Sequence, residues 1–555
     1  MSCRIRLVAA ALLSVAACVR GFAGTPDDDA NMADYQRFRD AVIGYVRADA
    51  DAYLAGTPAP SMQPAEFDHS GRWSVEVAVY LDGTLRGLGQ SRADHLSGAL
   101  HASTVTALSG ETFLTPRDLM RARFVVTFVY PPRRAASIVE YHGRGLELMG
   151  DVVPLRELDR SMVEDDLERA KRYLLRIMDG KLHGFPKTDD AATDTAEDRL
   201  RTIYTASSLY TLLKLDTWKP DPAIQQQILP IARYLLSMQC LEGPCRGAFY
   251  YSYFPAEDRR EPRFVVGTAS KTVFTLLELW RRTQDEQYLA SARLAGDWLT
   301  TMVNPDGSLS AAIEYKEGSW STERRFSLLY SGQVLSALSR LYTATRDERY
   351  RNAAGRIASL CRTKMASANG HVLGDDFREA NSVSTSWVAK AMFDYSRIDG
   401  DPSDHDVVYR ALNAVLAHQV DTPWDPYVDG SIYDAPSSSG TGWINEVLTD
   451  VYQLCREDGR ADCDRYRLAM LHASRWLLQR TYSEANAFNA RNPAHAAGGA
   501  IRSYGETIIR TDAVCHGSNS LLELLSMAGD DIHLTLPPPP FGQFFRALRS
   551  SMEHG

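Results

Sequence analysis

Residues 510–517 (RTDAVCHG) bring together side chains that could move protons. Asp512 and His516 are four residues apart, so a helix would place both on one face. Arg510 stands beside them and could hold an anion. The loop just before adds three further polar side chains: Arg502, Tyr504 and Glu506. A second interpretation is open, in which Asp512 caps the helix and His516 is a packed polar residue.

Other loops carry residues suited to binding or cleaving a sugar chain. Glycoside cleavage needs two carboxyl groups across the bond, and Glu323 and Asp376 are candidates beside those above. Epimerisation or β-elimination needs a base near a uronate carbon, with cations on the carboxylate. Further residues could bind substrate through charge or aromatic stacking: Arg324, Arg325, Tyr433, Trp387 and Trp443. For Trp387 a place in the core is equally compatible with the sequence.

A repeated pair of helical segments must position these residues. Six outer-type segments are expected near 160–178, 222–239, 285–302, 347–365, 403–419 and 462–482. Six more apolar, inner-type segments alternate with them near 203–215, 268–282, 328–343, 383–397, 441–455 and 511–527. One helix pair cannot bury its apolar face alone, so the repeat predicts a stacked array. We expect residues 156–530 to close into an (α/α)6 toroid, in which the first outer and the last inner helix complete the sixth pair.

The stretch LLYSGQVLSALSRLYTATRDERYRNAA (328–354) resembles the six-hairpin glycosidase-like superfamily, most nearly the helical domain of glucuronyl C5-epimerases. The resemblance implies the toroid fold and an activity on carbohydrate. It does not select one reaction, because glycoside hydrolases, polysaccharide lyases and epimerases share this architecture.

The Cys515-His516-Gly517 step also resembles the CHG motif of lanthionine cyclases, which implies a zinc ion held by that Cys, that His and a second cysteine. The second cysteine belongs at the start of the preceding inner helix, where residues 440–447 read GTGWINEV. A catalytic zinc needs three protein ligands, and only two are evident. We therefore expect no metal and no other cofactor, with a zinc enzyme as the least favoured alternative.

Residues 30–152 have a different pattern, with a helical start and β-branched strand candidates at 73–81, 123–130 and 136–142 around a helical stretch at 93–108. This predicts an α+β domain. The order of strand, DG turn, LRG, small-residue helix and LTPRDL resembles the AMMECR1 family. The family's Gly-Cys-Ile-Gly loop is replaced by Gly87-Leu88-Gly89-Gln90, so a cysteine function is not carried over.

The N-terminus is typical of an export signal, with a basic start and an apolar run over 7–17. The signal within residues 1–23 would end either at a lipobox ending at Cys18, which would be retained and carry a lipid, or by cleavage after Ala23. Both routes predict a periplasmic, outer-membrane lipoprotein or secreted protein. In such a compartment the spacing suits the disulfides Cys240–Cys245 and Cys455–Cys463, with Cys361 and Cys515 left over. The Pro-rich tail, 531–555, is expected to end in a short docking helix.

These observations predict an exported enzyme that acts on a polysaccharide by hydrolysis, elimination or uronate epimerisation, and the arginines favour an acidic one. The alternative from another class is a non-catalytic carbohydrate-binding or scaffold lipoprotein. Nucleic acid is not an expected partner, because the net charge is −9 and no basic stripe occurs. A lipid on Cys18 would provide a membrane tether, and the oligomeric state is not specified.

Overall fold

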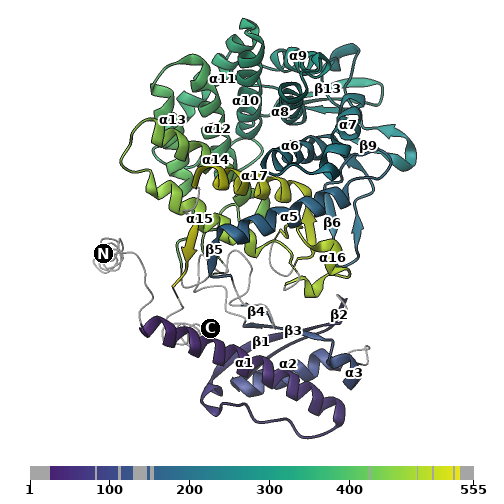
Figure 1. The fold of residues 1–555 in the computed structure, drawn as a ribbon, viewed down its shortest axis with the longest axis vertical. Coiled ribbons are helices and arrows are strands. Elements are labelled where there is room, and N and C mark those ends of the chain that lie inside the picture. The colour runs from purple at the N-terminus through teal and green to yellow at the C-terminus, as the bar shows by residue number, and fades with distance from the viewer. Residues whose placement is uncertain are drawn as a thin grey trace.

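The structure is a computed structural model that describes residues 26–81, 84–109, 114–128, 147–149, 155–423, 426, 428–483, 486–502, 506–528 and 532–537. The export signal, the strand expected at 136–142, Tyr504 and the docking helix of the tail lie outside these residues. Figure 1 shows two parts, an α+β domain drawn in purple and blue and a larger helical ring running from blue through teal and green to yellow. This arrangement confirms the predicted fold class.

The α+β domain is an antiparallel sheet in the order β2-β1-β3-β4, covered by helices α1 and α2. Its elements are α1 (Pro26–Ala55), η1 (Ala65–Phe67), β1 (Ser70–Leu81), β2 (Thr84–His95), α2 (Leu96–Leu108), α3 (Pro116–Leu119), β3 (Arg123–Phe128) and β4 (Glu147–Met149). Trp73, Phe124 and Phe38 are buried between sheet and helices. A Cβ on Gly87 or Gly89 would come within 2.0 Å of a carbonyl oxygen of α2, so these glycines allow strand and helix to touch.

The ring contains six inner and six outer helices among the described residues. The inner helices are α6 (Thr202–Trp218), α8 (Val266–Thr283), α10 (Leu328–Thr345), α12 (Ser382–Asp399), α14 (Ser438–Glu457) and α17 (Thr511–Ala528). The outer helices are α5 (Arg160–Ile177), α7 (Pro222–Ser237), α9 (Glu286–Thr301), α11 (Glu348–Ser367), α13 (Ser403–Leu416) and α15 (Asp464–Gln479). Each inner helix packs against the next, and α17 packs against both α6 and α5, so the ring is closed as predicted (Figure 1).

One strand pairing joins the ends of the ring, and close packing joins its inner helices. The short strand β15 (His533–Thr535) pairs antiparallel with β5 (Glu157–Asp159), which joins the segment after the last helix to the segment before the first. Inner helices also approach closely where they cross: a Cβ on Gly332 of α10 would lie 2.6 Å from the Trp387 carbonyl oxygen of α12. The small residues that mark the inner helices therefore set the diameter of the ring.

The loops that precede the inner helices carry short antiparallel strands and form one rim of the ring. These strands are β6 (Thr188–Asp190), β7 (Thr195–Ala196), β8 (Leu200–Arg201), β9 (Ser252–Phe254), β10 (Arg259–Arg260), β11 (Arg263–Val265), β12 (Ala312–Lys316), β13 (Ser319–Glu323) and β14 (Ile508–Arg510). Four short helical turns complete the described loops: η2 (Gly243–Cys245), η3 (Pro255–Glu257), η4 (Ala487–Asn489) and α16 (Pro493–Ala496). Because β14 pairs with β6, Arg510, which directly precedes α17, is fixed beside Thr188 in the loop before the adjacent inner helix α6.

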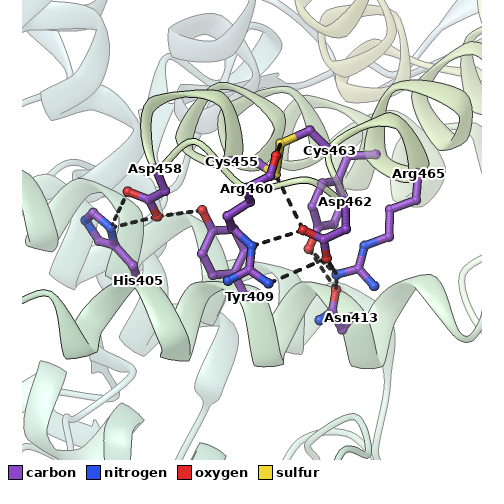
Figure 2. A network of polar contacts seen from close by, with 10 residues as sticks. His405, Tyr409, Asn413, Cys455, Asp458, Arg460, Asp462, Cys463 and Arg465 are labelled. Carbon is purple, nitrogen blue, oxygen red and sulfur yellow. Dashed lines mark hydrogen bonds and ion pairs between the residues drawn. A yellow bond between two sulfur atoms is a disulfide. The ribbon is translucent and has the colours of Figure 1, made fainter.

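Both predicted disulfides are formed, while Cys361 and Cys515 are buried thiols. Cys455–Cys463 closes the turn between α14 and α15, where a polar network joins that turn to α13 (Figure 2). In this network His405 Nδ1 lies 3.0 Å from the Asp458 carboxylate, which also accepts a hydrogen bond from the Tyr409 hydroxyl. No helix in the described part of the chain is long and apolar enough to span a membrane.

Candidate active site

The inner helices present the same positions to the centre of the ring. The second and sixth residues of all six line one cavity of about 330 Å³, open at the rim, which we call the cleft. The second residues are Ile203, Gly267, Leu329, Val383, Ser439 and Asp512. The sixth residues are Ser207, Lys271, Gln333, Trp387, Trp443 and His516. Residues four apart share a helix face, so each layer is a ring of six residues around the axis.

Two tryptophans form the aromatic part of the cleft floor. The rings of Trp387 and Trp443 stack with centroids 3.7 Å apart and planes 15° from parallel. The indole nitrogen of Trp443 donates to Ser386 Oγ at 3.1 Å, which fixes its orientation. Both residues are almost fully buried, at 3% and 4% exposure, yet both line the cleft. Both tryptophans therefore belong to the core and also to the floor of the cleft. For Trp387, a place in the core and a position where it could stack on a substrate are thus compatible.

His516 and Glu446 form a hydrogen-bonded pair beside these rings. His516 Nδ1 lies 2.5 Å from Glu446 Oε1, and the side chains are each 12% exposed. The Trp443 ring meets the imidazole edge-on at 5.3 Å. Burial alone would raise the pKa of Glu446, but His516, Lys271 and Lys214 outweigh it and hold that pKa below its usual range. The carboxylate thus stays ionised and orients the imidazole through Nδ1. The second ring nitrogen, Nε2, is not used in this contact.

Lys271 is the cationic member of the floor. Its ammonium nitrogen lies 4.8 Å from the ring centroid of Trp387 and 4.7 Å from that of Trp443. Burial is the main cause that lowers the pKa of Lys271 to about 8; nearby Arg340 adds to this effect, while Glu446 opposes it. At neutral pH the side chain is still mostly charged.

Arg510 and Asp512 form one wall of the cleft. The guanidinium group makes two parallel hydrogen bonds to the carboxylate, at 2.9 and 2.7 Å, and donates to the Tyr204 hydroxyl at 3.2 Å. Burial would raise the pKa of Asp512, but the bonds from Arg510 lower it overall. The predicted group around 510–516 is therefore brought to one cavity, although Asp512 and His516 have different partners.

A second, smaller cavity of about 60 Å³ continues beneath the tryptophans, and we call it the lower chamber. Three ion pairs lie in or beside it: Lys214–Glu523 at 2.5 Å, Lys390–Asp450 at 2.8 Å and Arg340–Asp394 at 3.0 Å. Burial, with Asp450 and Glu446 nearby, raises the pKa of Glu523 to about 7 despite the pairing with Lys214. Each of these three cations is therefore paired with a carboxylate.

The mouth of the cleft is a wider cavity of about 690 Å³ at the rim. Arg502 and Glu506 line it, and Leu329, Arg378 and Arg510 line both the mouth and the cleft. The predicted residues Arg502 and Glu506 thus lie at the entrance of the cleft and not on its floor.

Five other predicted residues lie outside the linings of the cleft and its mouth. Glu323 pairs with Arg325 at 2.8 Å on the exposed edge of β13, which lowers the pKa of Glu323 to about 2, and Arg324 is exposed beside them. Asp376 accepts a hydrogen bond from the Phe326 backbone at 2.7 Å and so joins two loops. Tyr433 stacks on His418.

Sequence reasoning missed the residues that lie deepest. Glu446, Lys271 and Gln333 are within inner helices, which were treated as apolar scaffold. A usable signal was present, because aligning the six inner helices puts a polar or aromatic residue at the sixth position every time. The wall residues Tyr204, Tyr251, Tyr330 and Arg378 were missed as well.

The Cys515-His516 step does not form a shared ligand set. Cys515 Sγ lies 3.6 Å from Ser208 Oγ in the packing of α17 against α6, and burial raises its pKa to about 12. No group of three or more His, Cys, Asp or Glu side chains within the described residues could hold a metal ion.

No family model and no curated protein sequence matches the chain. Among solved structures, the cellobiose 2-epimerase of Bacillus thermoamylovorans is 13% identical, covering 66% of this chain and 98% of its own, with a TM-score of 0.52. A sugar epimerase from a ruminal bacterium is 10% identical, covering 67% of this chain and 99% of its own, also with a TM-score of 0.52. These similarities support the (α/α)6 toroid fold. They leave the AMMECR1-like and glucuronyl-epimerase resemblances as predictions.

Proposed function

We propose that the toroid is a carbohydrate-active enzyme whose His516–Glu446 pair transfers a proton to or from a saccharide bound in the cleft. The observation that carries this proposal is an imidazole oriented by a buried carboxylate, 2.5 Å away, on the floor of an open cavity. A positioned histidine of this kind is the commonest general acid or base in enzymes. The fold shared with two sugar epimerases supports a saccharide as the ligand.

The lining of the cleft fits a saccharide. Indole faces stack well on sugar rings, while hydroxyl groups need a few placed donors and acceptors. Gln333 supplies a buried side-chain oxygen without a hydrogen-bond partner among the described residues. Arg510, Asp512 and Tyr204 supply a polar wall. A polysaccharide could enter through the wider mouth, past Arg378 and Arg502.

The carboxyl groups favour proton transfer at carbon over glycoside hydrolysis. Hydrolysis requires one carboxyl group held protonated by its surroundings. Asp512, which lines the cleft, and Glu446, which lines the lower chamber beside His516, are both held ionised by neighbouring cationic and hydrogen-bonding groups. Glu523 has a raised pKa but lines the lower chamber, beneath the tryptophans. Epimerisation and β-elimination need only a base and a cation, which His516 and Lys271 provide.

The proposal includes export of the protein. Two disulfides are typical of an oxidising compartment, and the N-terminal signal pattern agrees with them. Lipidation at Cys18 would hold the enzyme at a membrane surface, where a polysaccharide is made or remodelled. The AMMECR1-like domain would then stand between the tether and the ring.

A reaction in D₂O tests the proposal. Residues 24–555 are incubated with neutral and uronate-containing polysaccharides and followed by proton NMR. Either deuterium at a sugar carbon with inversion, or an unsaturated uronate at a new chain end, is the expected result. New reducing ends with neither deuterium at carbon nor an unsaturated uronate would show a hydrolase and contradict the role given to His516. Binding without any chemical change would support the non-catalytic alternative.

A further inference from the structure

Lys271 differs from the other cations inside the ring. Lys214, Arg340 and Lys390 each have a carboxylate oxygen within 3.0 Å. Lys271 has no carboxylate within 4.0 Å among the described residues, and Glu446, the nearest in influence, is already paired with His516. A partly buried ammonium without a counter-ion is costly, so its retention needs a reason.

The position of Lys271 supplies that reason. It is the only side chain of the sixth-residue layer, as described, that carries an aliphatic ammonium group, and it lines both the cleft and the lower chamber. Its nitrogen lies under 5 Å from the centroids of both indole rings, at the edge of the stack that these rings form. They are also the surface on which a sugar ring would rest.

The structure assigns Lys271 as the residue that binds a carboxylate of the substrate, which makes the substrate an acidic saccharide containing uronate. This inference rests on the proposed function, because it places the carboxylate beside the proton-transferring His516. Arg378 and Arg502 at the mouth have no ion pair among the described residues and extend the positive charge outward.

The assignment gives the reaction a balanced course. The C–H bond next to the carboxylate breaks, and its proton passes to Nε2 of His516. The electron pair moves into the carboxylate, giving an enediolate whose added negative charge Lys271 stabilises. Return of a proton from Nε2 to the same face completes exchange, and protonation of the opposite face by a water molecule completes epimerisation. Departure of the substituent on the next carbon, which takes the proton from His516, gives an unsaturated uronate instead. Neither course requires an oxidant or reductant.

A titration of acids against their own methyl esters tests the inference. The probes are glucuronate and galacturonate di- and trisaccharides, their methyl esters, and sulfated disaccharides without carboxylate, measured by calorimetry. Wild-type protein should bind at least one acid 10- to 100-fold more tightly than its ester. Lys271→Met should abolish this preference. The matched control is Lys364→Met, because Lys364 also lies over an aromatic ring, Phe326, but on outer helix α11.

The results separate this inference from the function on which it rests. Equal binding of acids and esters, a preference only for the sulfated probes, or a preference that survives Lys271→Met would overturn the inference. If neutral saccharides exchange deuterium while acids are not preferred, the proposed function stands and the role of Lys271 falls. If acids are preferred through Lys271 but no saccharide exchanges, the carboxylate site stands and the proton-transfer function falls.

Discussion

Two histidine–carboxylate pairs involve helix α14 or the turn that follows it. In the ring centre, His516 Nδ1 pairs with Glu446 at 2.5 Å, with both side chains 12% exposed. On the outer face, His405 Nδ1 pairs with Asp458 at 3.0 Å, with 28% and 26% exposure, in the network of Figure 2. The local chemistry is similar, but His516 lines the cleft, whereas neither His405 nor Asp458 lines any of the cavities described above. Under the proposed function, the position of such a pair in the ring, and not the pair itself, makes the histidine catalytic.

Substituting the carboxylate partner of each histidine should give the largest difference between the two pairs. Glu446→Gln removes the charge that orients His516, and turnover should fall about 10- to 1,000-fold, as for orienting carboxylates elsewhere. Asp458→Asn makes the matching change on the outer face and should leave kcat within about twofold. Steady-state kinetics on any saccharide that reacts checks both. Equal losses in the two variants would mean that both pairs are structural.

The outer network should reveal itself through stability and not through turnover. The Cys455–Cys463 disulfide closes a loop with a sequence separation of 8, so Cys455→Ser with Cys463→Ser should lower the free energy of unfolding by about 2–3 kcal/mol. Urea unfolding measures the loss. Turnover per folded molecule should not change, and a large drop in kcat would show that the outer face is coupled to the cleft.

The inner region should show the reverse, a functional residue that costs stability. The pKa of Lys271 in the folded protein, about 8, is below the ordinary 10.5, so the unfolded chain binds more protons between these values. Wild-type stability should therefore rise from pH 8 to 10.5, while below pH 8 the full cost is present. Lys271→Met should be more stable than wild type by about 1–2 kcal/mol at pH 7. Thermal unfolding should show this gap closing toward pH 10.5; a constant gap would contradict the account.

The smallest effects are expected at rim residues that the sequence suggested but the cleft does not include. Glu323→Gln and Tyr433→Phe should each leave kcat/KM within about twofold, because neither side chain lines the cleft or its mouth. Asp512→Asn, in the cleft wall, serves as the contrasting variant and should lower kcat/KM about tenfold or more. If Glu323→Gln has the larger effect, the binding surface extends over β13.

The fold could be predicted because a stacked helical repeat produces a regular alternation of helical segments that is visible in the sequence. The alternation of helix types gave the toroid, and the residues around 510–516 gave one wall of the cleft. The residues at the floor of the cleft were not predicted, because Lys271 and Glu446 are single polar residues in largely apolar helices. Only the rotation of each helix about its axis decides that they point inward. Glu323 and Asp376 attracted attention because loop acids are conspicuous, yet loop proximity does not fix the direction of a side chain.

The most direct test of the central claim is deuterium exchange in matched histidine variants. His516→Gln and His405→Gln are compared with wild type in D₂O on the same saccharide, with circular dichroism confirming the fold of each. The account predicts that His516→Gln lowers the exchange rate at carbon by a factor of about 100 or more, while His405→Gln stays within about twofold of wild type. Unchanged exchange in folded His516→Gln would contradict the proton-transfer role and leave the cleft as a binding site alone.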